Sequence, residues 1–427
     1  MVTRLQMLWD TTRSSLWALP LLMICLAIAL AVAAIQVQLP QFSSPVWYFY
    51  SGNSLSAGNF LSALLTSMIT MATLAVSITV VVLTLAAQQL GSRLIRNFIG
   101  DRRTQISLGT FISTVVYLLI VLRTTSGASD NVPNLAVTIG TVLVLVSVVT
   151  MVLFVHHLAR SIVADNLIDR VGADLDAYVA SLLPENDAPP MPSPLPNVRE
   201  KGAPVRLPCG GYVQALDHQR LVQIARSAGA TIELAFRPGQ HAVPETVYGY
   251  VLPSSALTPE LISEIAASLV MGNERTPVQD LEFSIRQLVE VAVRAMSPGI
   301  NDPYTAIAAI DRLTLSLSKI MRRKPSQSVW CDEDGKVRLI VPVSTFEGTV
   351  DAAFHQIRQQ GERIPAVIIR LAEDLIQLLD VASPEQRPAI EKHLRLVLQA
   401  GRRSIPEPED LRDLQQRIEA LLGRKPS

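Results

Sequence analysis

The sequence predicts an α-helical membrane protein with four transmembrane helices, followed by a cytoplasmic α+β domain that ends in a helical bundle. Two observations predict this fold class. The 427 residues are 49% hydrophobic and the mean hydropathy is positive, +0.32, which is typical of a chain partly embedded in lipid. The long apolar segments lie before residue 160, whereas the rest of the chain alternates helical and strand patterns separated by Pro and Gly.

The apolar segments define a transmembrane domain over residues 1–158. A bilayer core of about 30 Å requires about 20 apolar residues per helix. The segments that reach or approach this length are residues 20–37, 60–87, 106–122 and 135–158. The first has no convincing small-residue cleavage site and three spans follow it, so we expect it to be retained rather than removed as a signal peptide.

Basic residues near the span ends predict the orientation. The first connection, "QLPQFSSPVWYFYSGN", contains no Lys or Arg and has an aromatic cluster suited to a membrane interface. Arginines gather on the other side of the predicted spans, at Arg4, Arg13, Arg93, Arg96, Arg102, Arg103 and Arg160. Because basic residues favour the cytoplasmic side, we expect a multi-pass protein of the bacterial inner membrane with both termini in the cytoplasm.

Three further parts are expected after the spans. Residues 159–208 read as an amphipathic helix, which could continue the fourth span, and a Pro-rich linker. Residues 209–256 read as a small α/β unit with the strands "GYVQAL", "TIELAFRPG" and "VYGYVLP". Residues 257–427 read as mainly helical, with a hairpin near 328–343 that turns at Asp334-Gly335.

The second span carries a stripe of hydroxyl groups in "TSMITMATLAVSITVVVLT". Their spacing of three, four and seven residues places them on one helix face. This face is either a wet surface or a packing seam, since Ser and Thr can also bond to their own helix or permit close helix packing. The third span adds a smaller polar face with Thr110, Ser113, Thr114 and Tyr117. The candidate pore-lining residues of the second span are Ser62, Thr66, Thr70, Thr73, Ser77, Thr84 and Gln88.

Composition and motifs argue against several classes of protein. Lys+Arg and Asp+Glu balance at 37 each, so no nucleic-acid partner is expected. The three cysteines are far apart and form no Cys/His cluster, so neither a metal site nor another cofactor is expected. The common nucleotide-binding, hydrolase and metalloprotease motifs are missing, so we expect no enzyme. The spans lack a central ionisable residue, which disfavours proton-coupled transport.

In the helix expected at residues 277–295, Glu282, Arg286, Glu290 and Arg294 recur every four residues with alternating sign. This ladder reads as a solvated, mutually paired face, with a subunit contact as the alternative. The segment "MSPGINDPYTA" follows. Pro298-Gly299 predicts a turn, and Asp302 predicts a helix cap with Pro303 in the first helical position. A second interpretation is a ligand or gating contact at this helix start, formed by Ser297, Asn301, Asp302 and Thr305.

The longer segment "FSIRQLVEVAVRAMSPGINDPYTAI" and the upstream "GNERTPVQDLE" resemble the hallmark of a family of predicted bacterial membrane proteins, domain of unknown function 2254. The resemblance extends to the leading spans, the "GYVQALD" strand and the "RPG" turn. The resemblance implies an inner-membrane protein with a cytoplasmic domain, but it does not imply any particular reaction or substrate.

Two functions remain open on the sequence alone. The first is a homo-oligomeric, cyclic ion channel or tension-responsive pore in the lipid bilayer, because four helices in one chain enclose too little space for water. The alternative is a membrane-anchored scaffold or sensor whose cytoplasmic domain binds a partner, with the hydroxyl stripe merely packing helices.

Overall fold

The computed structural model describes residues 17–37, 50, 53–90, 101–125, 132–161, 163–185 and 194–422. Arg4, Arg13, Arg93 and Arg96 lie outside the described residues, as does part of the expected Pro-rich linker. The chain divides into two compact units, residues 1–166 and 167–427.

The first unit contains four helices that are long and apolar enough to span a membrane, as predicted. Each extends beyond the predicted apolar segment at one or both ends, because polar residues can continue a helix after its hydrophobic part ends. The helices are α2 (Ala18–Gln36), α3 (Ser54–Leu90), α5 (Arg102–Thr125) and α6 (Asn134–Ser161).

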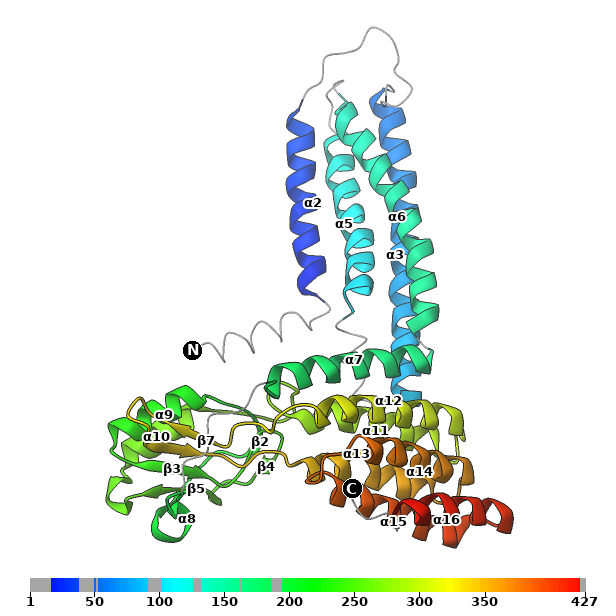
Figure 1. Cartoon of the computed structure of the whole chain (residues 1–427). Helices are drawn as coiled ribbons and strands as arrows, with labels where there is room; N and C mark the ends of the chain where they lie inside the picture. The colour runs from blue at the N-terminus through cyan, green and yellow to red at the C-terminus, as the bar shows by residue number, and fades with distance from the viewer. Residues whose placement is uncertain are drawn as a thin grey trace. The chain divides into compact units, whose positions relative to one another are not determined.

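Helix α5 is the centre of the first unit, lying between α2 and the pair of α3 and α6 (Figure 1). Small residues permit this close packing, since a Cβ added at Gly109 would lie 2.5 Å from the sulfur of Met23 on α2. On the other side, Phe111 of α5 meets Phe154 of α6 edge to face, with ring centroids 6.1 Å apart.

Helix α7 (Ala164–Leu182) is separate from α6, and most of it belongs to the second unit. The fourth span therefore does not continue as one helix. The carboxylate of Asp176 on α7 accepts hydrogen bonds from three side chains of α12 (Pro303–Met321): Arg312 at 2.7 Å, Ser316 at 2.9 Å and Lys319 at 2.6 Å. These contacts fix α7 against α12.

The second unit contains two β-sheets that share one hydrophobic core. The five-stranded sheet has the order β1-β5-β3-β8-β7, and the three-stranded antiparallel sheet has the order β4-β2-β6. The strands are β1 (Ala203–Arg206), β2 (Gly211–Leu216), β3 (Thr231–Leu234), β4 (His241–Ala242), β5 (Val247–Leu252), β6 (Leu269–Gly272), β7 (Val329–Cys331) and β8 (Val337–Ile340).

The expected hairpin near 328–343 is β7 and β8, and it joins this sheet rather than the helices beside it in sequence. Strand β8 pairs in parallel with β3, with Ile232 opposite Leu339. The side chains of Ile232 and Leu339 are fully buried, so the pairing completes the core. Short helices accompany the sheets: α8 (Val198–Lys201), α9 (His218–Ser227), η2 (Ser254–Ala256) and α10 (Pro259–Ala267).

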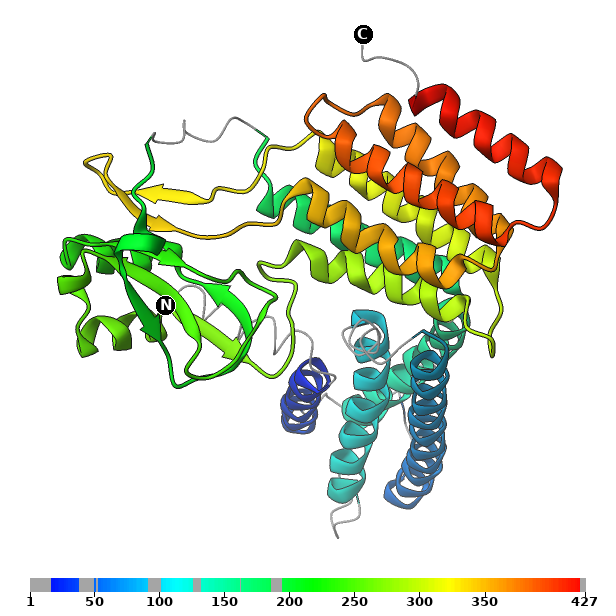
Figure 2. The same ribbon diagram turned by 90° about the horizontal axis from the view of Figure 1, so that it is seen from below.

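The remaining helices form a bundle whose neighbours lie side by side in Figure 2. Helix α11 contacts α12 and α13, α14 contacts α12 and α15, and α16 packs on α14 and α15. The second unit is therefore an α+β region that ends in helices, as predicted. Besides α12, the helices of this bundle are α11 (Leu281–Ala295), α13 (Phe346–Gly361), α14 (Pro365–Asp380), α15 (Arg387–Ser404) and α16 (Pro408–Leu422).

Candidate functional sites: a hydroxyl face and a polar junction

The hydroxyl groups of the predicted stripe point away from the helices with which α3 packs, whereas Thr79 of the same helix is buried. Its buried positions include Leu61, Met68, Ala75 and Val82, which repeat every seven residues and are at most 7% exposed. At about 100° per residue, the hydroxyl stripe lies on nearly the opposite side of the helix. The stripe residues with described side chains are all exposed in the single chain: Ser62, Thr66, Thr70, Thr73, Ser77 and Thr84. We call these six residues the hydroxyl face; the side chain of Gln88 lies outside the described residues.

Four threonines of the hydroxyl face donate to a carbonyl one turn earlier on the same helix. Each bond satisfies the hydroxyl proton and leaves oxygen lone pairs as acceptors. These four threonines can therefore meet water or lipid without an unpaired donor. The acceptors are the carbonyl of Ser62 for Thr66 at 2.9 Å, of Thr66 for Thr70 at 3.0 Å, of Ile69 for Thr73 at 2.9 Å and of Val80 for Thr84 at 2.8 Å.

The polar residues of α5 behave differently, because two of them are buried between helices. The hydroxyl of Thr114 lies 3.1 Å from that of Ser147 on α6. The phenol of Tyr117 donates a 2.9 Å hydrogen bond to the carbonyl of Ala136. Thr114 is 1% exposed and Tyr117 is fully buried, so the expectation of a polar face on the third span is wrong for these two residues. They hold α5 and α6 together.

The loop before α12 has the predicted cap. The amide of Thr305 donates to Asp302 Oδ1 at 3.1 Å, and the Thr305 hydroxyl donates to Oδ2 at 2.6 Å. These bonds hold the pKa of the Asp302 carboxyl below its usual range. Asn301 adopts a left-handed conformation, with φ of 51°, and its amide donates to the carbonyl of Ser297 at 2.8 Å. The structure thus brings Ser297, Asn301, Asp302 and Thr305 into one turn.

The segments that carry the family resemblance meet at a polar junction between the sheets and α11. From the "RPG" turn, Arg237 donates a 2.6 Å hydrogen bond to Glu282. From "GNERTPVQDLE", Gln279 bonds both backbone groups of Leu216 at the end of β2, at 2.9 and 3.1 Å. Gly239, with φ of +88°, lies so close to Asp280 that an added Cβ would be 2.1 Å from its carboxylate. Only glycine fits there.

Asp280 is the most buried charge of this polar junction, at 2% exposed. Arg275 donates to its Oδ2 from Nε at 2.9 Å and from Nη2 at 2.5 Å. Burial raises the pKa of the Asp280 carboxyl, and the charge of Arg275 opposes that rise. Among the described residues Oδ1 of Asp280 has no hydrogen-bond partner.

The charge ladder of α11 is only partly a solvated face. Arg286 pairs with Glu282 at 3.4 Å and Arg294 with Glu290 at 3.3 Å, so the predicted mutual pairing is present. Glu282, however, is 5% exposed and belongs to the polar junction. The sequence did not predict the roles of Arg237, Gln279 and Asp280, because their partners lie in other elements. The signal that could have indicated them is that all three lie in "RPG" or "GNERTPVQDLE", the segments that carry the family resemblance.

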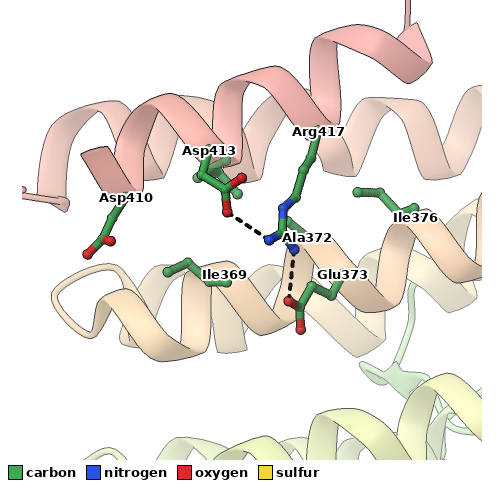
Figure 3. A pocket seen from close by; sticks show the side chains of 8 residues that line it. Ile369, Ala372, Glu373, Ile376, Asp410, Asp413 and Arg417 are labelled. Carbon is green, nitrogen blue, oxygen red and sulfur yellow. Dashed lines mark hydrogen bonds and ion pairs between the residues drawn. The ribbon is translucent and has the colours of Figure 1, made fainter. Parts of the chain in front are cut away.

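A hollow between α14 and α16 lies elsewhere in the second unit (Figure 3). Arg417 of α16 spans it, reaching Glu373 of α14 at 3.2 Å and Asp413 of its own helix at 2.8 Å. The cavity volume is about 40 Å³, whereas pockets for small molecules typically measure about 300–1,000 Å³. This hollow suits water rather than a substrate.

Together these features define a multi-pass membrane protein with an α+β region and helices after its spans. The chain belongs to the family of predicted membrane proteins designated DUF2254, which matches residues 13–377. It is similar to uncharacterised proteins of Mycobacterium bovis and of two strains of Mycobacterium tuberculosis. Each is 28% identical over 425 residues, covering 96% of this chain and 80% of the relative. No solved structure matches the chain.

Proposed function

We propose that the protein is a homo-oligomeric ion channel or tension-responsive pore of the bacterial inner membrane. Both termini are in the cytoplasm, and the second unit forms a cytoplasmic ring. The observation that carries the proposal is the placement of the hydroxyl face opposite the buried side of α3. A row of exposed hydroxyl oxygens on a transmembrane helix suits an arrangement in which several copies of that helix surround water.

The physical argument has two steps. The first unit alone packs its helices around α5 and has its hydroxyl face outside this core, so a water-filled path needs further copies of α3. Closed rings are the usual arrangement of identical subunits. Hydroxyl oxygens are weak ligands, which lets ions enter such a path and also leave it. We therefore expect the bilayer, like subunits and permeant ions as partners, and no enzymatic reaction.

Ion flux through the purified protein in liposomes tests this proposal, measured with and without membrane tension. Thr73→Leu adds bulk to the hydroxyl face and should reduce flux, whereas Thr73→Val removes the oxygen with little change in shape. The matched control is Val149→Leu on α6, where the side chain is 60% exposed and lies off α3. The channel proposal fails if wild-type flux equals that of empty liposomes, or if Thr73→Leu and Val149→Leu behave alike.

The second candidate is a membrane-anchored scaffold or sensor. The back-bonded threonines favour it, because a hydroxyl with a satisfied proton can face lipid at little cost. Beside the Asp302 cap, Tyr304 is 81% exposed and Ile300 is 42% exposed, which suits a partner contact. A scaffold should recover a stoichiometric foreign protein from native membranes, and Tyr304→Ala with Ile300→Ser should lose it. A channel should recover mainly copies of itself.

A further inference from the structure

Three side chains with metal-binding atoms converge between α13 and α15. Asp351 and His355 are four residues apart on α13, and His393 comes from α15. Asp351 Oδ1 lies 2.8 Å from Nε2 of His393 and 3.1 Å from Nε2 of His355. One ligand atom from each of the three residues lies within 4.8 Å of the others.

Burial and hydrogen bonding define the surroundings of this cluster. His393 is fully buried, and burial lowers the pKa of its imidazole. Burial alone would raise the pKa of Asp351, but hydrogen bonds from His393 and Lys392 outweigh it and the net pKa is lowered. The ring of Phe354 packs against that of His393, with centroids 6.0 Å apart, and helps to hold its orientation.

Hydrogen bonding alone leaves this cluster poorly satisfied. His355 and His393 both direct a nitrogen at the same oxygen, Asp351 Oδ1, and Lys392 lies 3.2 Å from both Oδ1 and Oδ2. The imidazoles lie with centroids 4.7 Å apart, so both cannot carry a positive charge without repulsion. Nδ1 of each ring is buried and has no partner among the described residues. One divalent cation bound through Nε2 of each ring would accept lone pairs from all three ligands at once and would leave the ring proton on Nδ1.

We propose that Asp351, His355 and His393 bind a divalent transition-metal ion, with Zn²⁺ as the probe ion. Two imidazoles and one carboxylate are a ligand set that suits Zn²⁺, Co²⁺, Fe²⁺ and Mn²⁺. Metal bonds of about 2.0–2.2 Å place tetrahedral ligand atoms about 3.4 Å apart, so Asp351 Oδ1 must move slightly away from the two Nε2 atoms, which lie 2.8 and 3.1 Å from it. The ammonium of Lys392 leaves the carboxylate; its side chain is 40% exposed and can turn to solvent. Water completes the coordination.

This site is independent of the proposed pore, because all three ligands belong to the helical part of the second unit. A bound ion would fasten α13 to α15. The sequence predicts no metal site, since it contains no Cys/His cluster. Its local signal is the four-residue spacing of Asp351 and His355, which places both on one helix face. His393 is supplied by packing alone.

The test uses the full chain in detergent, purified without a polyhistidine tag. Calorimetric titration with Zn²⁺ should show one ion per chain, and Co²⁺ should produce a visible absorption band. His355→Gln and Asp351→Asn should each weaken Zn²⁺ binding by about tenfold or more, since loss of even an outer-shell partner costs about 10–100-fold. His241→Gln is the matched control, because His241 is exposed and lies on β4, and binding should be unchanged.

Lys392→Gln separates a metal site from a purely structural ion-pair network. If Lys392 competes with the metal for Asp351, Lys392→Gln should bind Zn²⁺ several-fold more tightly than the wild type. Zn²⁺ should also raise the Tm of the wild type and not that of His355→Gln. A cooperative unfolding transition of His355→Gln without Zn²⁺ verifies that the variant is folded. Absence of stoichiometric binding to the wild type overturns the proposal. An equal loss of Zn²⁺ affinity in His355→Gln and His241→Gln also overturns it.

Discussion

The guanidinium of Arg237 donates a 2.6 Å hydrogen bond to the carboxylate of Glu282 and joins the turn after β3 to the first turn of α11. The side chains are 20% and 7% exposed, respectively. The pair therefore connects the sheets to the helices inside one unit, at the polar junction. A pair so withdrawn from water stabilises the fold only while both partners are present.

Arg237→Ala should destabilise the protein strongly, because it leaves Glu282 buried without its main partner. We expect a loss of about 3–5 kcal/mol in the free energy of unfolding. Arg286→Ala is the control: Arg286 also pairs with Glu282, but at 3.4 Å and with a side chain 37% exposed, so the loss should be about 0–1 kcal/mol. Thermal unfolding of both variants in the same detergent measures the difference. Equal Tm values would contradict the structural role of Arg237.

Asp302→Ala should weaken the start of α12 by about 1 kcal/mol, because it removes the cap that Thr305 uses. Asn301→Gly should cost little, since glycine readily adopts the left-handed conformation of Asn301. Hydrogen exchange of the first-turn amides of α12 measures both effects. If Asp302→Ala abolishes ion flux while exchange and Tm remain as in the wild type, the turn has a ligand or gating role beyond capping.

Cross-linking tests the neighbours of the hydroxyl face directly. In a chain whose native Cys25, Cys209 and Cys331 are replaced by Ser, Thr73→Cys should form a disulfide between copies when native membranes are treated with an added oxidant such as copper phenanthroline. Met68→Cys is the control, because Met68 is fully buried inside the first unit and cannot reach another chain. Dimers on a non-reducing gel for Thr73→Cys alone support a shared axis. Monomers for both variants would contradict a close approach of neighbouring copies at Thr73.

The sequence predicted the parts whose signal is local. Span length, the Asp302 cap and the strands "GYVQAL" and "VYGYVLP" each follow from neighbouring residues, and each appears in the structure. The parallel pairing of β3 with β8 did not follow, because it joins residues about a hundred positions apart. The burial of Glu282 was missed for the same reason: its partner Arg237 lies in another element. Long-range packing, rather than local pattern, decides these features.

Asp374 on α14 should make stability depend on pH between about 4 and 6. It is 2% exposed, and burial raises the pKa of its carboxyl to about 6, although the Thr314 hydroxyl donates to it at 2.9 Å. Arg370 Nε lies 3.4 Å from Asp374 Oδ1, but the same guanidinium donates to both carboxylate oxygens of Asp311 at 2.7 and 2.9 Å. The negative charge of Asp311 also raises the pKa of Asp374. An unfolded Asp has a pKa of about 3.9, so the folded state holds this proton more tightly.

The stabilisation from the Asp374 proton is therefore complete below about pH 4 and is lost as the pH rises through about 6. A shift of about two pKa units corresponds to about 3 kcal/mol. Asp374→Asn stays neutral at every pH and keeps an oxygen for Thr314. Its free energy of unfolding, compared with that of the wild type, should therefore rise by up to about 3 kcal/mol between pH 4 and pH 7. Unfolding curves of both proteins at these two pH values measure the gain. A constant difference between them would show that Asp374 is ionised throughout, held by Arg370.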